Sequence, residues 1–294
     1  MFYRFAISTI LLIQTLVSGA ITDLSSELNA YIGRSNADIG VAVITDCGDT
    51  ITVNDHRRYQ MNSVMKLYQA MAVMNALDRG GMPIDSVVTI QPSELHSDTW
   101  SPMRDQYNSE NEILIPISRL IEYSIQQSDN NACDILFDHI AGTNDTDRYI
   151  RTLGIEGFAI TFNENAMHQD PTLSDANWTY PSAAASLIHR LFTRQLYAPE
   201  YQDFLTSTLT GCKTGNMRLP SPLPGDAIIG HKTGTGFNDI EGNPQGINDV
   251  GFIRLSNGRT YAIAVFIGRT DTDMSRSEQI IADISSIVLS HIPH

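Results

Sequence analysis

Apolar residues recur at helical spacing through the middle of the chain. A run that opens at Met61 keeps apolar residues three or four positions apart as far as Leu77, and the pair Gly80-Gly81 then supplies a helix stop signal. The same periodicity predicts helices at residues 21–32, 63–79, 116–127, 129–141, 145–153, 181–194, 199–209 and 275–291. The polar spans at residues 92–111 and 162–180 are expected to form long loops. Loops of this length in a compact domain are usually functional or disordered.

Strand-like runs lie near the two ends of the chain instead. They predict strands at residues 39–44, 51–53, 227–234, 250–255 and 260–267. Asn257-Gly258 supplies a two-residue hairpin turn between the last two. Strands at both ends with helices between them imply one sheet assembled from both termini, and therefore an α+β fold with a helical insertion. We expect a single domain over 21–294, with a cleft between an α/β lobe (21–60 and 210–294) and a helical lobe (61–209).

The first residues of the chain have the layout of a secretory signal peptide over residues 1–20. Arg4 gives a positive start, residues 5–17 are almost continuously apolar, and Ser18-Gly19-Ala20 supplies small residues at a cleavage site. The apolar core is too short to span a bilayer comfortably. No cysteine lies at the cut and no second hydrophobic span follows. We therefore expect a mature protein that begins near Ile21, has no membrane anchor and is soluble outside the cytoplasm.

The formal net charge is −14, and it becomes more negative once Arg4 is removed. A chain this acidic is a poor partner for nucleic acid or for an anionic membrane surface. The charge also makes the cations informative, because the whole chain has only three lysines, at Lys66, Lys213 and Lys232.

The cysteines Cys47, Cys133 and Cys212 are odd in number and lack the spacing of metal ligands. One disulfide with one thiol left over is an alternative that the sequence leaves open, and Cys133, in an apolar helical run, is expected to be a buried thiol. No His-x-His or His-Glu-x-x-His arrangement occurs, which argues against a zinc hydrolase. We expect neither a metal nor an organic cofactor.

A serine and a lysine stand one helical turn apart at the start of the run that opens at Met61. Ser63 and Lys66 are three positions apart, so on a helix they project from one face and the amine can hydrogen-bond the hydroxyl. Free backbone N–H groups at a helix N-terminus favour developing negative charge. A hydroxyl, a base and an anion-stabilising backbone are parts of an acyl-transfer site. The alternative is a core helix whose serine is a cap and whose lysine is solvated.

Two further motifs carry polar side chains beside apolar elements. Ser128-Asp129-Asn130 precedes an apolar helix, where these residue types are also favoured as N-caps. Lys232-Thr233-Gly234-Thr235 ends an apolar strand, where a cation and hydroxyls can face a carboxylate; its alternative is a strand that leads into a glycine turn. Lys213-Thr214-Gly215 repeats the tripeptide without a strand before it, so we assign the functional role to the copy at Lys232.

The ordered set S-x-x-K, S-D-N and K-T-G resembles class A β-lactamases and penicillin-binding proteins over essentially the whole mature chain. That resemblance implies an antiparallel sheet flanked by helices, with a helical subdomain. Glu164, within Phe162-Asn163-Glu164-Asn165-Ala166, matches the Ω-loop glutamate that activates the deacylating water in class A enzymes. Met167-His168 replaces the usual Leu-Asn. This departure resembles the PER and VEB types, which are extended-spectrum cephalosporinases. The same resemblance is carried by Thr99-Trp100-Ser101-Pro102, residues 127–136 and Asn177-Trp178.

The resemblance implies a role for each matching residue. Ser63 attacks the β-lactam carbonyl, with Lys66 or Glu164 as the base, and the backbone N–H groups of Ser63 and Thr235 form the oxyanion hole. Ser128 relays a proton to the leaving nitrogen, and Glu164 activates water for deacylation. Substrate-binding roles fall to Asn130, Lys232, Thr233, Gly234, Thr235, Trp100, Arg218 and His168. Three of these roles have alternatives. Arg218 is either a cation near Lys232 or a surface arginine, and Trp100 either lines the cleft mouth or is a packed loop anchor. His168 either replaces the usual asparagine in holding water, or the Ω-loop folds differently at this point.

Two rival functions remain open for the same residues. A DD-peptidase that acts on cell-wall peptides would use the same nucleophile, but Glu164 and the missing anchor argue against it. A secreted protein that senses β-lactams or cell-wall fragments would be acylated once without turnover. With β-lactams as its only expected partners, the hydrolase is expected to be a monomer in the bacterial periplasm.

Overall fold

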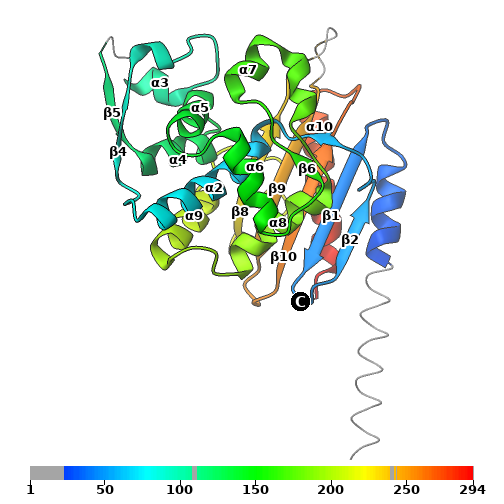
Figure 1. Cartoon of the computed structure of the whole chain (residues 1–294). Helices are drawn as coiled ribbons and strands as arrows, with labels where there is room; N and C mark the ends of the chain where they lie inside the picture. Colours follow the sequence, from blue (N-terminus) through cyan, green and yellow to red (C-terminus); the bar gives the residue numbers. More distant parts are fainter. Residues whose placement is uncertain (1–22, 108–110, 239–241, 243, 294) are drawn as a thin grey trace, which may run out of the picture.

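The computed structural model describes residues 23–293 except 108–110, 239–241 and 243 (Figure 1). The signal peptide expected at residues 1–20 lies outside the described residues. Every helix within the described part of the chain is too short or too polar to traverse a bilayer.

A five-stranded antiparallel sheet is built from both ends of the chain, as the strand pattern predicts. Its order is β2-β1-β10-β9-β8, so strands from the two termini meet where β1 pairs with β10, from Ile39 opposite Ile267 to Thr45 opposite Tyr261. β8 therefore forms one edge of the sheet. The strands are β1 (Ile39–Thr45), β2 (Thr50–Val53), β8 (Ile228–Thr235), β9 (Ile247–Arg254) and β10 (Thr260–Ile267).

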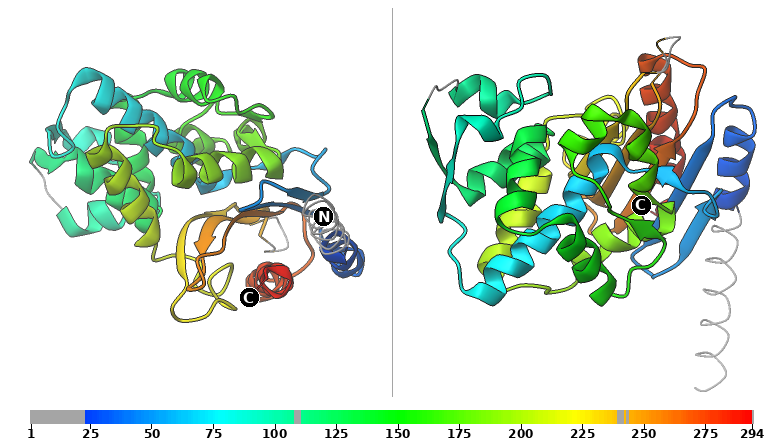
Figure 2. Two further views of the ribbon diagram at one scale, coloured as in Figure 1. Left: turned by 90° about the horizontal axis from the view of Figure 1, so that it is seen from below. Right: turned by 45° about the horizontal axis from the view of Figure 1, so that its top comes forward.

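Helices cover both faces of this sheet (Figure 2). On one face the helix at residues 23–32 and α10 (Met274–His291) bury a separate apolar cluster that includes Leu28, Ile281 and Val288. On the other face α8 (Pro181–Thr193) packs against β1, β9 and β10, and the remaining helices lie beyond it. Strands of the sheet contribute side chains to both apolar core clusters, which also include residues of the covering helices. An antiparallel sheet packed between helices confirms the α+β class.

The helical part of the chain follows the predicted periodicity closely. α2 (Met65–Gly80) ends where Gly81 adopts a left-handed conformation at φ 60°, as the paired glycines predict. This helix is buried along most of its length, which explains why its apolar residues extend beyond a single stripe. The other predicted helices begin and end within two residues of expectation, as α4 (Ile117–Gln126), α5 (Asn130–His139), α6 (Thr143–Thr152) and α9 (Pro199–Thr210).

The two expected loops contain more regular structure than the sequence indicates. The first holds η2 (Pro92–Glu94) and α3 (Pro102–Tyr107), and the second holds α7 (Glu164–Gln169), η3 (Pro171–Ala176) and β7 (Trp178–Thr179). The sequence did not predict some short strands, because their apolar runs are too brief for a strand pattern to be distinguished from a helical one. These strands are β3 (Tyr59–Gln60), β4 (Val87–Ile90), β5 (Ile113–Pro116) and β6 (Phe158–Ala159).

All three cysteines are free thiols, so the alternative of one disulfide is wrong. Cys133 is fully buried in α5, as its apolar surroundings predict, whereas Cys47 is exposed and Cys212 is partly buried.

Candidate active site

Ser63 lies in a tight turn directly before α2. The turn is the 3₁₀ segment η1 (Asn62–Val64), and α2 begins one residue later, so Lys66 falls in the first turn of the helix. The Lys66 side chain is completely buried, and its Nζ lies 3.1 Å from the Oγ of Ser63. The solvated lysine of the alternative interpretation is therefore wrong. The pair has the contact that the three-residue spacing predicts.

Lys66 is the centre of a buried polar cluster that joins four segments. Its amine donates to the Oδ1 of Asn130 at 2.6 Å and to the carbonyl oxygen of Ser128 at 2.8 Å. It also forms an ion pair with the Oε1 of Glu164 at 2.9 Å, and this same oxygen lies 3.4 Å from the Oγ of Ser63. A buried ammonium needs such partners, because an unpaired charge in the interior is costly. Ser63 therefore faces the Glu164 carboxylate, which can accept its proton, and the Lys66 amine, which can accept it only in the neutral form.

The turn at residues 128–130 serves both of the roles that its sequence suggests. Asp129 is the N-cap of α5: its carboxylate accepts from Ala132 N at 2.9 Å and also binds the Oγ of Ser101. Ser128 has a left-handed backbone at φ 57°, which is uncommon for serine. Asn130 instead binds Lys66. The capping residue is thus Asp129, which leaves its two neighbours free to point toward the nucleophile.

β8 brings the third motif to the same place. Lys232 is fully buried, and its Nζ donates to the Oγ of Ser128 at 3.0 Å and to the carbonyl oxygen of Thr233 at 2.8 Å. A Cβ on Gly234 would lie 2.6 Å from the carbonyl oxygen of Met61, so only glycine lets the strand pass this close to the nucleophile turn.

The edge position of β8 also directs a backbone donor to the site. The Gly236 N–H bonds to the Gly246 carbonyl, toward β9. Because successive residues of an antiparallel edge strand point their N–H groups alternately toward the neighbour and away from it, the N–H of Thr235 faces the open edge. That edge is the one that lies against η1 and Ser63.

The buried amine of Lys232 has a shifted pKa. The pKa of Lys232 is lowered to about 7, chiefly by burial and then by the nearby positive charge of Lys66. The Lys232 amine is poised to lose its proton near neutral pH.

The second Lys-Thr-Gly tripeptide packs directly behind the first. Lys213 is exposed, but the Oγ1 of Thr214 lies 2.6 Å from the Oγ1 of Thr233. Gly215 has φ 72°, and a Cβ there would lie 2.4 Å from the Cγ2 of Thr233. The repeat is therefore no independent site, but it supports the strand that carries Lys232.

Arg218 is buried rather than on the surface, so the second of its two interpretations is wrong. Its guanidinium donates to the carbonyl oxygen of Gly234 at 3.1 Å and to the Oγ1 of Thr235 at 2.9 Å, and it pairs with Glu278 at 3.1 Å. The planar donor fork of arginine suits this arrangement, because it reaches several acceptors at once. Arg218 thereby fixes the end of β8 and adds positive charge beside it.

The helix that carries Glu164 is held by two buried acceptors. The carboxylate of Asp134 accepts from the backbone N–H groups of Glu164 at 2.8 Å and of Asn165 at 2.7 Å. The Oδ1 of the buried Asn177 accepts from Thr161 N at 2.7 Å, which ties together the two ends of the segment. Both residues stand in stretches that resemble the PER and VEB types, but nothing in the sequence shows which backbone groups they bind.

The comparisons with known proteins agree with this geometry. Residues 23–292 match the sequence model of the Beta-lactamase enzyme family. A β-lactamase of Bacteroides uniformis is 34% identical, over 91% of this chain and 90% of that protein. The β-lactamase VEB-1 of Pseudomonas aeruginosa is 33% identical, over 93% of this chain and 92% of its own.

Among solved structures, a class A β-lactamase from Bacteroides cellulosilyticus superimposes with a TM-score of 0.88 at 32% identity, covering 92% of this chain and 98% of that one. The protein belongs to the class A β-lactamases. Its resemblance to the PER and VEB types is confirmed by the match to VEB-1.

Met167 and His168, which stand in place of the usual Leu-Asn, lie in different surroundings in this β-lactamase. Met167 is buried, and the Nε2 of its neighbour His168 lies 3.2 Å from the Oδ2 of Asp98, while its ring faces that of Phe237. His168 is thus directed away from Glu164, and its role in substrate binding stays a prediction.

Trp100 is 64% exposed and donates from Nε1 to the carbonyl oxygen of Gln127 at 2.9 Å. Its own carbonyl accepts from the N–H of Asn130 at 3.0 Å. The indole therefore projects into solvent while its backbone supports the turn at residues 128–130, which favours the mouth of the site over a packed anchor.

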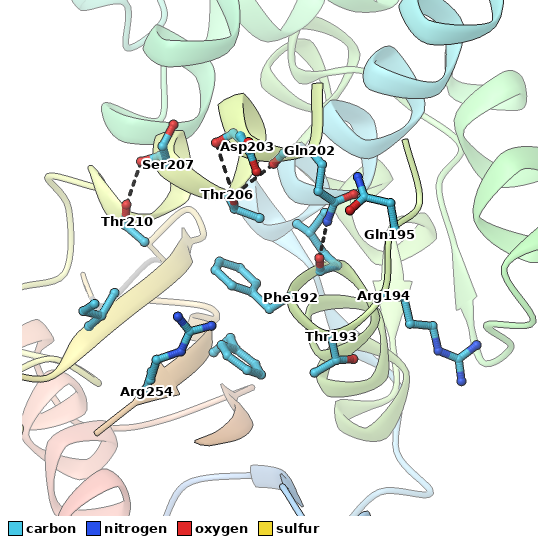
Figure 3. Close-up of a pocket in the computed structure, with 13 residues that line it drawn as sticks. Phe192, Thr193, Arg194, Gln195, Gln202, Asp203, Thr206, Ser207, Thr210 and Arg254 are labelled. Carbon is cyan, nitrogen blue, oxygen red and sulfur yellow. Dashed lines mark hydrogen bonds between the residues drawn. The ribbon is translucent and has the colours of Figure 1, made fainter. Parts of the chain in front are cut away.

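Two surface pockets lie outside the cluster around Ser63. One, of about 500 Å³, lies between α8, α9 and the start of β8, where Phe192 stacks on Phe252 at 4.8 Å (Figure 3). The other, of about 520 Å³, adjoins the β-lactamase site through Gln60 and Phe237 and is bordered by Thr172. Gln60, which lines this second pocket, lies two residues before the nucleophile turn that starts at Asn62.

Proposed function

We propose that this β-lactamase hydrolyses its substrates in two steps through an acyl-enzyme on Ser63. The observation that carries the proposal is the contact of Lys66 Nζ with both Ser63 Oγ, at 3.1 Å, and Glu164 Oε1, at 2.9 Å. A serine activated by an adjacent base is the arrangement that nucleophilic catalysis requires. β-Lactam hydrolysis itself follows from the family.

Acylation begins when Ser63 attacks the lactam carbonyl and loses its proton. Glu164 can receive that proton at 3.4 Å or through water, and Lys66, 3.1 Å away, can receive it once its own extra proton has passed to Glu164. The developing oxyanion is held by the backbone N–H groups of Ser63 and Thr235. Removal of one such donor typically costs roughly a hundred- to thousandfold in rate.

Ring opening then requires a proton on the lactam nitrogen. Ser128 relays it: its hydroxyl gives a proton to the nitrogen and takes in its place the proton released by Ser63 and passed on by Lys66, while the amine of Lys232 donates to that hydroxyl at 3.0 Å. Lys232, Thr233 and Thr235 bind the substrate carboxylate, on a strand whose backbone Gly234 allows to approach. Asn130 binds the acylamino group of the substrate while it accepts from Lys66.

Deacylation is assigned to Glu164, which takes a proton from the attacking water. Its backbone is fixed by Asp134, so the carboxylate stays beside Ser63 throughout the cycle. Lys66, which pairs with Glu164, then provides the path for the proton to return to Ser63.

We further propose an extended-spectrum preference for cephalosporins, which confers antibiotic resistance. The support is the resemblance to VEB-1, together with the roomy pocket beside Gln60 and Phe237. Trp100, and His168 beside Phe237, contact the substituents of the substrate, with Arg218 behind the carboxylate subsite.

The remaining expectations are proposals of the same standing. The mature enzyme is a periplasmic monomer of residues 21–294 after cleavage of the signal peptide. Its site lies between the α/β lobe (21–60 and 210–294) and the helical lobe (61–209).

The test is steady-state turnover of a chromogenic cephalosporin together with intact mass of Glu164→Ala. The wild type is expected to turn over continuously, and Glu164→Ala to accumulate an adduct on Ser63. Glu156→Ala is the matched control, because Glu156 is a surface glutamate paired with Arg151. Unchanged turnover in Glu164→Ala would refute the assignment. Stoichiometric acylation of the wild type without turnover would indicate the sensor or the DD-peptidase instead.

A further inference from the structure

The turn that carries Ser63 is bonded to the sheet by a buried asparagine that the mechanism above does not use. Asn248 lies on β9, directly opposite Gly234 of β8, and it is only 1% exposed. Its amide nitrogen donates to the carbonyl oxygens of Gln60 at 2.9 Å and of Met61 at 3.2 Å. These two carbonyls come immediately before η1, so one side chain of the sheet holds the entry to the nucleophile turn.

Gly234 leaves the space that this amide occupies. Directly opposite residues of an antiparallel pair project their side chains to the same face, so a side chain at position 234 would stand beside that of Asn248. A Cβ on Gly234 would lie 3.1 Å from the amide nitrogen of Asn248 and 2.6 Å from the carbonyl oxygen of Met61. The glycine of the Lys-Thr-Gly motif therefore makes room for the hydrogen bond between β9 and the turn.

The turn depends on such bonds because part of its backbone is strained. Asn62 has a φ of 47°, in the left-handed region that few residues other than glycine adopt. A residue in this region persists only where its surroundings fix it. The Met61 carbonyl that Asn248 binds also accepts from the N–H of Val64 at 3.0 Å, which closes the turn around Ser63. Asn248 thus binds the acceptor on which the turn itself is built.

The amide of Asn248 uses its donor side alone. Its Oδ1 is buried and has no hydrogen-bond partner within the part of the chain that the structure describes. A buried acceptor without a partner costs free energy, which an apolar residue of the same size would not cost. The two bonds to the turn are therefore what this asparagine provides and a leucine would not.

Asn248 is connected to both halves of the oxyanion hole. The two N–H groups assigned to the oxyanion belong to Ser63, in the turn, and to Thr235, at the end of β8. Asn248 holds the turn through its side chain, and it pairs with β8 one residue before Thr235. Arg218 fixes this pairing, because its guanidinium donates to the carbonyl oxygens of Asn248 at 3.0 Å and of Gly234 at 3.1 Å.

We propose that Asn248 is a positioning residue for the oxyanion hole: by binding the carbonyls of residues 60 and 61, it holds the N–H of Ser63 at the distance from the N–H of Thr235 that the transition state requires. The proposal rests on the proposed serine mechanism, because the oxyanion forms only when Ser63 attacks a carbonyl. Both donors must lie about 2.7–3.1 Å from the oxyanion at the same time. A turn released from β9 therefore loses transition-state binding.

The test uses two substitutions in the full-length protein. Asn248→Leu keeps most of the volume and removes the donor, and Asn248→Ala removes the donor with no added atom that could clash. In both, kcat/KM for a chromogenic cephalosporin is expected to fall about tenfold, within the roughly hundredfold that a displacement of about 1 Å can cost. The Ki of phenylboronic acid should rise by a similar factor, because its tetrahedral adduct on Ser63 places an oxygen in the oxyanion hole.

Gln69 supplies the matched control. Like Asn248 it is buried, its amide donates to a main-chain carbonyl, that of Cys133 at 2.7 Å, and its Oε1 has no partner among the described residues. This amide joins α2 to α5 instead of joining the sheet to the turn. Gln69→Leu and Gln69→Ala should lower the urea midpoint of unfolding but change the Ki of phenylboronic acid by less than about twofold, since no oxyanion donor moves.

Two results would overturn the positioning role. One is a Ki of phenylboronic acid that stays near the wild-type value in Asn248→Leu, which would assign any loss in Asn248→Ala to packing. The other is an equal rise of Ki in the Gln69 variants, which would assign the effect to general stability. If Ser63 of the wild type is not acylated by a cephalosporin, the serine mechanism itself fails. Acylation of Ser63 at an unchanged rate in both Asn248 variants refutes the positioning role alone.

Discussion

Thr214 and Thr233 belong to the two copies of Lys-Thr-Gly in this chain, and their hydroxyl oxygens lie 2.6 Å apart. One copy faces the nucleophile and the other lies behind it. The short contact means that the support for the carboxylate subsite comes from a segment that contains no strand of its own.

Replacing Thr214 tests this support. Thr214→Val removes the hydroxyl and leaves Thr233 free to rotate, so KM for a cephalosporin is expected to rise with little change in kcat. The loss in kcat/KM should be about two- to tenfold, the value of one net hydrogen bond of about 0.5–1.5 kcal/mol. Thr214→Ser keeps the hydroxyl and serves as the control in the same steady-state assay. Equal losses in both variants would show that packing, rather than the hydrogen bond, is what matters.

Arg218 is expected to be important for stability as well as for the site. Arg218→Met leaves Glu278 unpaired and removes the donors to Gly234 and Thr235, so the free energy of unfolding should fall by about 3 kcal/mol. Urea denaturation measures this directly. Arg148→Met is the matched control, since that arginine is 74% exposed in its pair with Asp145 and should cost no more than about 0.5 kcal/mol. Similar losses in the two variants would contradict the buried role.

Asp134 should make stability depend on pH in an unusual direction. Burial and then the charge of Glu164 raise its pKa from 3.8 to about 7. Because the folded-state pKa is raised, the contribution of Asp134 to stability is fully present below pH 3.8 and is lost as pH rises through about 7.

The comparison with Asp134→Asn isolates this contribution. The stability advantage of the wild type over Asp134→Asn is expected to shrink by at least about 1 kcal/mol between pH 4 and 7. Urea unfolding across that range is the measurement, and Asp145→Asn, at a surface carboxylate, should show no such trend. An advantage that grows with pH would mean that the backbone N–H groups of residues 164 and 165 outweigh burial.

His168 separates two accounts of deacylation. Since it pairs with Asp98 and not with Glu164, His168→Ala should not accumulate an acyl-enzyme, in contrast to Glu164→Ala. Loss of the partly exposed ion pair should change the free energy of unfolding by less than about 1 kcal/mol. Intact mass after brief exposure to a cephalosporin distinguishes the variants. An adduct that persists in His168→Ala would show that the histidine positions the water after all.

Local patterns in the sequence were sufficient for the elements that carry the site. The periodicity from Met61 to Leu77 and the glycine pair after it define α2 because helix spacing and its C-terminal signal are properties of neighbouring residues. The order of the motifs identified Ser63 and Lys232 for the same reason. Each tripeptide is recognisable without knowledge of what lies opposite it.

Contacts between distant segments were not predictable in this way. Asp134 binds N–H groups 30 and 31 residues ahead, and Thr214 meets a threonine 19 residues later. Neither side chain carries a local sign of its partner. The strands β4 and β5 were missed because four-residue runs are too short for a strand period to be distinguished from a helical one.

The pairing of β1 with β10 determines when activity can appear during synthesis. Ile39 aligns with Ile267, and Lys232 lies on a strand that reaches the sheet only through β9 and β10. Contacts of such long sequence separation form slowly, because loop closure must precede them. A growing chain therefore carries its nucleophile long before it has a complete site. The site is therefore complete only once β9 and β10 have joined the sheet.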